Sequence, residues 1–246
     1  MADAIPLTLH ALSSETVTGS GARQQLAGLH SAVDLQLVIS TVTALLTVTV
    51  ETSADGVSGW VPIGAFDPAT DPMRQRRVFA GCDAFVRCSW DGSGTFALSG
   101  AQHVLYAGLE DLHAELPQAA ISDLPEHVQA KHLLSASNDA EDAIAMTRPM
   151  PLASWPESVT MRCAQIAAWR CLTARGVDTE STADRIVKET YDEARAWLDN
   201  VARDKLRPPG LAPATAMGAK VEDAAPVTTT VQPVRVRFSD DWGDFG

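Results

Sequence analysis

Phe85-Val86-Arg87-Cys88-Ser89-Trp90 is a strand-like run, and after the turn signal Asp91-Gly92 a second run follows as Thr95-Phe96-Ala97-Leu98. Aromatic and β-branched residues favour strands, and Asp-Gly between two such runs is a strong hairpin signal. The stretch predicts a β-hairpin whose alternate side chains enter a hydrophobic core.

The alternation extends outward from this stretch over residues 5–100. Leu35, Leu37 and Ile39 recur at every second position, which is the period of a strand. Turn signals separate the runs at Asp55-Gly56, Ser58-Gly59, Asp67-Pro68, Asp71-Pro72 and Gly81. Several short strands at this spacing predict an antiparallel β-sandwich over residues 1–103.

Four aromatic residues of this region allow two interpretations. They are Trp60, Phe66, Phe79 and Trp90. Such side chains either fill a core or stack on sugar rings, as in a carbohydrate-binding module. We favour the core, because the four lie inside strand-like runs and no cluster of Asn, Asp or Gln accompanies them to bind hydroxyl groups.

Helical periodicity replaces the alternation near Tyr106 and predicts a small α-helical bundle over residues 104–207. The whole chain is therefore expected to be of the segregated α+β class. Prolines, glycines and capping residues predict four helices. They run from Leu109 to Leu116, from just after Ser122-Asp123 towards Met146, from about Glu157 to Gly176 and from near Ser181 onward.

Local signals support these limits. Ser154-Trp155-Pro156-Glu157 has the S-x-x-E spacing of a capping box, and Pro125 suits the first turn of the second helix. Apolar residues on one side of the last two helices are predicted to pack the bundle. They are Ile166, Trp169, Val187, Tyr191, Ala194, Leu198 and Val201.

Residues 208–246 form a predicted extended tail, rich in Ala, Pro and Thr. Its far end, Val231 to Phe238, alternates like a strand. A lone strand gains stability by pairing with another molecule, which predicts partner docking. The expected docking residues are Val234, Arg235, Val236, Arg237, Phe238 and Trp242. The alternative is a solubilising terminus that docks to nothing.

The net charge of −12 and the absence of a basic region argue against a protein that grips nucleic acid through its phosphates. Arg74-Gln75-Arg76-Arg77 is the nearest basic cluster, and it is interpreted as a solvated strand edge or turn. No apolar stretch is long enough to cross a membrane, and no signal peptide is apparent. We expect a soluble protein of the host cytoplasm during assembly.

Nothing in the sequence indicates catalysis, a metal site or a cofactor. The four cysteines form no C-x-x-C pair and are expected to be buried free thiols. His127 and His132 are five residues apart and point to different helix faces. Asp139, Glu141 and Asp142 lie on a helix face and are expected to be solvated. We therefore expect no enzyme.

An ordered set of motifs in the helical part resembles a known family. The motifs are Tyr106-Ala107-Gly108-Leu109-Glu110-Asp111-Leu112, Leu133-Leu134-Ser135-Ala136-Ser137-Asn138-Asp139-Ala140, Arg148-Pro149-Met150-Pro151-Leu152, Ala164-Gln165-Ile166-Ala167-Ala168-Trp169-Arg170 with Arg175-Gly176, and the run from Tyr191 to Lys205. Over residues 106–207 the chain resembles the head–tail connector, or adaptor, proteins of tailed bacteriophages and Mu-like prophages. One departure is Asp204, where the family usually has a glycine.

The resemblance implies a structural protein of the virion neck. Such a protein assembles with itself into a ring, commonly a dodecamer, beneath the portal protein. It binds the next neck component, a head-closure or tail-terminator protein, and lets double-stranded DNA pass without specific binding. No membrane is involved. The resemblance does not cover the N-terminal strands.

Two other classes remain open from the residues alone. One is a carbohydrate-binding sandwich on a helical spacer, which requires Trp60 or Trp90 to be exposed in a row. The other is an enzyme whose site lies between the two modules, which requires a cleft with convergent histidines and carboxylates.

Overall fold

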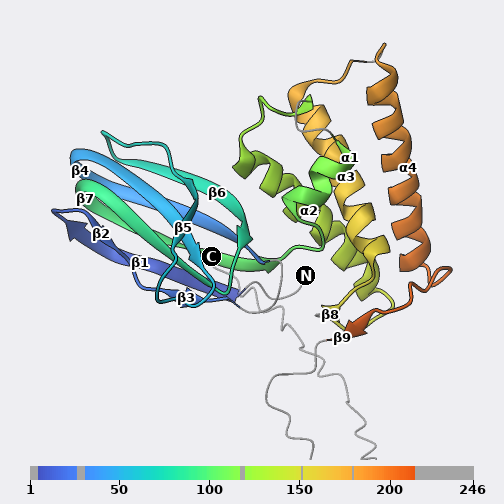
Figure 1. The fold of residues 1–246 in the computed structure, drawn as a ribbon, viewed down its shortest axis with the longest axis horizontal. Helices are drawn as coiled ribbons and strands as arrows, with labels where there is room; N and C mark the ends of the chain where they lie inside the picture. Colours follow the sequence, from blue (N-terminus) through green and yellow to red (C-terminus); the bar gives the residue numbers. More distant parts are fainter. Residues whose placement is uncertain (1–4, 27–30, 117–119, 151, 179, 214–246) are drawn as a thin grey trace, which may run out of the picture. The chain divides into compact units, whose positions relative to one another are not determined.

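A computed structural model describes residues 5–26, 31–116, 120–150, 152–178 and 180–213. Within these ranges the strands of the main sheet come first and four helices follow, with two short strands among and after the helices (Figure 1). The main sheet contains β1 (Ile5–Glu15), β2 (Gly19–Ser20), β3 (Gln24–Gln25), β4 (Ser31–Ser53), β5 (Val61–Ala65), β6 (Met73–Cys82) and β7 (Phe85–Val104). The helices are α1 (Leu109–Glu115), α2 (Glu126–Ala145), α3 (Glu157–Arg175) and α4 (Thr182–Ala202). This order confirms the predicted segregated α+β class.

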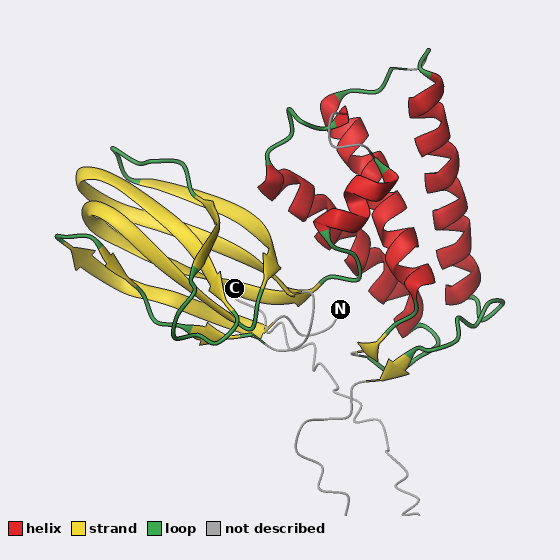
Figure 2. Cartoon of the chain, viewed as in Figure 1, coloured by secondary structure: helices red, strands yellow, loops and turns green. Residues whose placement is uncertain are grey.

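Two long antiparallel strands, β4 and β7, form the centre of the sheet (Figure 2). They pair from Ser31 with Val104 at one end to Ser53 with Phe85 at the other. β1 pairs with the C-terminal half of β7, whereas β2 and β3 pair with its N-terminal half. On the other side, β6 and β5 pair with the two halves of β4. β5 and β6 are therefore edge strands.

The hairpin predicted at Asp91-Gly92 is wrong, because Phe85–Val104 is one continuous strand. Register shifts between Ile39 and Thr47 mark a bend in the partner strand at the same level. Gly92 has a φ of 110°, and a Cβ atom there would lie 1.9 Å from the carbonyl oxygen of Leu45. The glycine that resembles a turn signal thus lets two strands approach closely at the bend.

The bend brings the two halves of the sheet against one hydrophobic core. From Leu35 to Ile39 the buried residues of β4 have odd numbers, whereas from Leu46 to Thr52 they have even numbers. The extra residues at the register shifts account for this change of face. Trp90 and Phe96 lie on opposite sides of the bend in β7, and their ring centroids are 5.5 Å apart.

The aromatic residues of the sheet belong to this core. Phe66, Phe79 and Trp90 are all buried. Trp60 is partly buried, and the Arg87 guanidinium lies 4.1 Å from its ring centroid. Trp60 and Trp90 therefore do not form the exposed row that the sugar-binding interpretation requires.

The caps of the helices partly follow the sequence signals. Ser181 caps α4, with its hydroxyl accepting a 3.3 Å hydrogen bond from the amide of Asp184. The capping box predicted for α3 is wrong, since Ser154 lies in a strand and Pro156 is the N-cap. Pro125 is likewise the N-cap of α2 and not part of its first turn. Strand pairing of Ser154 removes it from capping.

A second hydrophobic core lies among the helices and includes part of the sheet. Val78 and Ala80 of β6 belong to the same buried cluster as Leu133 of α2. α2 therefore packs against β6. The last long strand ends at Val104 and the first helix begins at Leu109. The division into 1–103, 104–207 and 208–246 as separate domains stays a prediction.

The chain turns sharply after α4 and then joins a small second sheet. Asp204 has a φ of 55°, and the amide of Lys205 donates a 2.9 Å hydrogen bond to the carbonyl of Asn200. Further on, β9 (Ala212–Pro213) pairs with β8 (Leu152–Ser154). This pairing fixes the point beside α3 from which the C-terminal residues continue.

Candidate functional site

The residues predicted to dock a partner lie outside the described part of the chain. They are Val234, Arg235, Val236, Arg237, Phe238 and Trp242, all beyond residue 213. Their docking role stays a prediction.

The residues predicted to pack the helices lie in or against the helical core. Ile166, Ala194, Leu198 and Val201 are buried. Trp169, Val187 and Tyr191 are partly buried and pack against the same cluster. α4 thus uses its apolar stripe against α2 and α3 of its own chain.

A carboxylate shared by two arginines ties three helices together. Asp139 of α2 accepts a 2.7 Å hydrogen bond from Arg170 of α3 and a second one from Arg195 of α4. Arg170 also donates to the Ser135 hydroxyl at 2.9 Å. The expectation that Asp139 is merely solvated is therefore wrong. Its arginine partners lie 31 and 56 residues away in sequence, so the helical pattern gave no sign of the contact.

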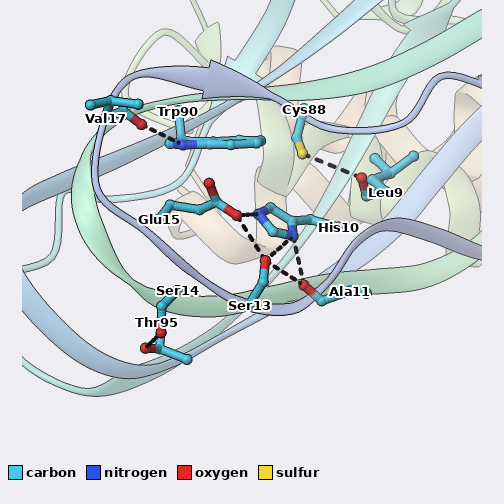
Figure 3. A network of polar contacts seen from close by, with 10 residues as sticks. All are labelled: Leu9, His10, Ala11, Ser13, Ser14, Glu15, Val17, Cys88, Trp90 and Thr95. Atoms are coloured by element: carbon cyan, nitrogen blue, oxygen red, sulfur yellow. Dashed lines mark hydrogen bonds and ion pairs between the residues drawn. The ribbon is translucent and has the colours of Figure 1, made fainter.

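A polar network in β1 places a serine, a histidine and a glutamate together (Figure 3). The Ser13 hydroxyl donates a 2.8 Å hydrogen bond to Glu15, and His10 Nε2 lies 3.3 Å from the same carboxylate. His10 Nδ1 is 2.6 Å from the carbonyl oxygen of Ala11, so this nitrogen carries the proton. It therefore cannot accept the proton of Ser13, whose hydroxyl lies 3.4 Å away. The arrangement therefore lacks the pairing of a nucleophile with a general base that a hydrolase needs.

The His10 network instead joins the edge strand to the core. The imidazole packs against the rings of Trp90 and Phe96, with centroids 4.6 and 4.2 Å away. The indole nitrogen of Trp90 donates a 2.9 Å hydrogen bond to the carbonyl of Val17 (Figure 3). These contacts add side-chain interactions between the β1 to β2 segment and β7, with which both strands pair.

The four thiols are free, as predicted. Burial raises the pKa of Cys82 and Cys171 to about 12 and that of Cys88 to about 11. Burial also raises the pKa of Cys163 well above its usual value. A thiol with so high a pKa is a poor nucleophile at neutral pH.

A groove opens between the edge strands β5 and β6 and the first turns of α1 and α2. We call it the β5–β6 groove. It consists of two adjoining hollows of about 510 and 170 Å³. Both are lined by Ile63, Gly64, Ala65, Ala80 and Glu126. Leu109 and Gly81 line the larger hollow, and Arg77, Phe79 and His127 the smaller one.

The lining residues of each strand are consecutive in sequence, over 62–65 in β5 and 77–81 in β6. The face of a strand presents alternate residues, whereas its edge presents consecutive ones. The groove is therefore bordered by strand edges. Within the described ranges, β5 and β6 each pair only with β4.

The two edges differ in their capacity to accept another strand. β5 contains Pro62, which has no N–H, and a register shift follows it. Gly64 has a φ of 154°, and a Cβ atom there would meet the Phe79 ring at 2.8 Å. Proline and irregular pairing protect an edge from strand addition. β6, Met73–Cys82, contains no proline and pairs in regular register from Met73 to Phe79, with a register shift only between Phe79 and Cys82, so its regular part keeps this capacity.

The charges of the groove leave one carboxylate without a counter-ion. Arg77 forms a 2.6 Å ion pair with Asp67 and also donates to the carbonyl of Ala65. Burial lowers the pKa of His127, which favours its neutral form. Glu126 is exposed and has no ion-pair partner among the described residues. The groove therefore suits an apolar segment that also carries positive charge.

The basic cluster Arg74 to Arg77 is part of β6, an edge strand, as its sequence interpretation anticipated. Arg76 pairs with Asp34 at 2.5 Å, so two of its three arginines have acidic partners. The described ranges contain no group of three or more His, Cys, Asp and Glu residues suited to hold a metal ion. None of the described helices is long and apolar enough to cross a membrane.

Comparison with known families finds a match in the helical part of the chain. Residues 106–224 match the family model described as Bacteriophage Mu, Gp36. The Gp36 match covers slightly less than half of the chain and begins where the strands end. It supports a phage protein with a structural or morphogenetic role, and it leaves the strands of residues 5–104 outside. No curated protein matches the chain.

Proposed function

We propose that the protein is an adaptor of the phage neck, which forms a homo-oligomeric ring and joins the portal to the tail-proximal connector components. The observation that carries this proposal is the Gp36 match, because its start at residue 106 coincides with the start of the helical part. The helical part would build the ring and continue the DNA channel. In this proposal the protein acts in the virion, at the junction of capsid and tail.

The charge of the chain supports passage of DNA. A net charge of −12 disfavours counter-ion release on contact with phosphates, which is the main source of nonspecific DNA binding. Arg170 and Arg195 both form ion pairs with Asp139, so their positive charges are less available to the phosphates of DNA. A DNA conduit needs walls of this kind, because tight contacts would stop the DNA from sliding.

The fixed helical core supports a rigid subunit. Asp139 joins α2, α3 and α4, and the apolar stripe of α4 is used within the chain. Contacts between subunits would then come from other surfaces, including the tail. In this proposal the tail docks through residues 234–238 and Trp242 onto the portal or a neighbouring subunit.

Electron microscopy of the full-length protein, alone and mixed with tailless capsids, tests the adaptor. A ring at the single portal vertex is the expected result. Protein that decorates the capsid surface, or does not bind capsids at any vertex, would refute the adaptor proposal. Binding to a glycan array would instead favour a carbohydrate-binding role.

Deletion of residues 231–246 tests the docking part of the proposal. The shortened protein is expected to keep its circular dichroism spectrum and melting temperature but to lose binding to portal-containing capsids. Replacement of the same residues by a Gly/Ser sequence of equal length is the matched control for chain length. Undiminished capsid binding by either variant would refute docking through the tail.

A further inference from the structure

The β5–β6 groove lies beside two edge strands of the sheet, β5 and β6, which pair only with β4 within the described ranges. Its walls are two strand edges and the first turns of two helices. Ile63, Ala80 and Leu109 supply apolar surface, and β6 supplies an edge without proline. An extended segment added there would gain main-chain hydrogen bonds and pockets for alternate side chains.

One segment of the chain has the matching pattern. Val234, Val236 and Phe238 alternate with Arg235 and Arg237. In a strand, the three apolar side chains would share one face and the two arginines the other. The apolar face suits the lining of the groove, whereas the arginines suit its unpaired carboxylate.

Charge strengthens this assignment. The segment carries two positive charges in a chain whose net charge is −12. Arg77 in the groove is already paired with Asp67, so it does not repel an incoming arginine as strongly as a free cation would. Glu126 then offers an ion pair at the rim of the groove.

The length of the tail permits docking on a neighbouring copy. Val234 is 21 residues beyond Pro213, the last described residue, which allows a reach of about 70 Å at ~3.3 Å per residue. A compact chain of some 210 residues has a radius of gyration of only about 17 Å. The tail is thus long enough to reach beyond its own subunit.

We propose that residues 234–238 of one copy add as a strand to β6 in the β5–β6 groove of a neighbouring copy. This inference rests on the ring of the proposed function and names the partner of its docking segment. Each subunit would then be linked to the next by a strand that also pairs with an edge strand of the sheet.

The first experiment measures amide hydrogen exchange of the full-length protein at a concentration where it associates. Val236→Pro removes one N–H and opposes strand pairing. We expect it to raise at least tenfold the exchange rate of those amides of residues 77–80 in β6 that do not bond to β4. The control Thr229→Pro lies in the same tail outside the alternating segment and should change nothing. Unchanged exchange in Val236→Pro would overturn the proposal.

A mixing experiment separates neighbour from self. The Val236→Pro variant has a damaged tail and an intact groove. The Glu126→Arg variant has an intact tail and a damaged groove. Native mass spectrometry of the mixture should show heterodimers, at concentrations where each variant alone is monomeric. Their absence would overturn docking between copies. Glu110→Arg, an equally exposed acid in the first turn of α1, is the control for the charge change.

Charge reversal provides a rescue. Arg235→Glu with Arg237→Glu should weaken association about tenfold, and adding Glu126→Arg to that chain should restore most of the loss. Absence of rescue would overturn the role of Glu126.

A ring at the portal vertex that Val236→Pro leaves intact would refute this strand addition but not the adaptor. Tail-linked copies with no ring at the vertex would refute the adaptor alone.

Discussion

Asp139 of α2 accepts a 2.7 Å hydrogen bond from Arg170 of α3, and the Asp139 side chain is only 27% exposed. The same carboxylate also holds Arg195 of α4. One negative charge therefore compensates two positive ones at the junction of three helices. Removing it leaves two partly buried guanidinium groups facing each other.

Asp139→Asn is expected to lower the free energy of unfolding by about 2 to 3 kcal/mol, because the amide has nearly the same shape but no charge. Urea denaturation followed by circular dichroism measures the change. Asp192→Asn is the control, since Asp192 forms an exposed ion pair with Lys188 on one helix and should cost at most about 0.5 kcal/mol. Equal losses in the two variants would show that Asp139 has no special role.

Gly92→Ala should destabilise the sheet by about 3 kcal/mol or prevent folding. Its φ of 110° disfavours a side chain, and the new Cβ would lie 1.9 Å from the Leu45 carbonyl oxygen. Gly59→Ala is the matched control, because Gly59 also has a positive φ, 61°, but nothing lies within 4 Å of the added atom. That control should cost only about 1 kcal/mol. Thermal unfolding of both variants distinguishes crowding from backbone strain.

Asp204 occupies a position that glycine suits better, since its φ is 55°. Asp204→Gly is expected to be more stable than Asp204→Ala by about 1 kcal/mol. Both variants lose the exposed ion pair with Arg207, so that contribution cancels in the comparison. Chemical denaturation of the two proteins gives the difference. An alanine variant as stable as the glycine variant would argue against a left-handed residue at this helix end.

The buried thiols predict a loss of stability at alkaline pH. The pKa of Cys88 is raised to about 11 and that of Cys171 to about 12, compared with about 8.5 for an exposed thiol. Above pH 8.5 the unfolded chain loses these protons while the folded chain keeps them, so the free energy of unfolding falls as the pH rises. The thiols should therefore not change the urea concentration at the midpoint of unfolding up to about pH 8.5. Between pH 9 and 11 they should lower it.

Iodoacetamide labelling at pH 8 checks the same burial directly. Cys88, Cys163 and Cys171 are buried, so we expect no labelling of these three until urea unfolds the protein. Cys82 is partly exposed and should react first, although slowly. Rapid modification of Cys163 in the native protein would contradict its burial in the helical core.

The sequence by itself determined the order of the main-sheet strands and the helices, the approximate limits of the helices and the alternation of core residues within regular stretches of strand. These features follow from local periodicity and from caps such as Ser181, which act within a few residues. The sequence also showed the family resemblance of the helical part, because the order and spacing of motifs can be compared without knowing which residues are in contact.

Only the tertiary structure decided whether Gly92 begins a turn or permits a bend, since the answer depends on the Leu45 carbonyl on another strand. It also decided that Asp139 bridges three helices, and that β5 and β6 leave a groove beside Glu126. Each of these depends on groups far apart in the chain. Their proximity is set by how the strands and helices pack, which the periodicity of a single segment does not specify.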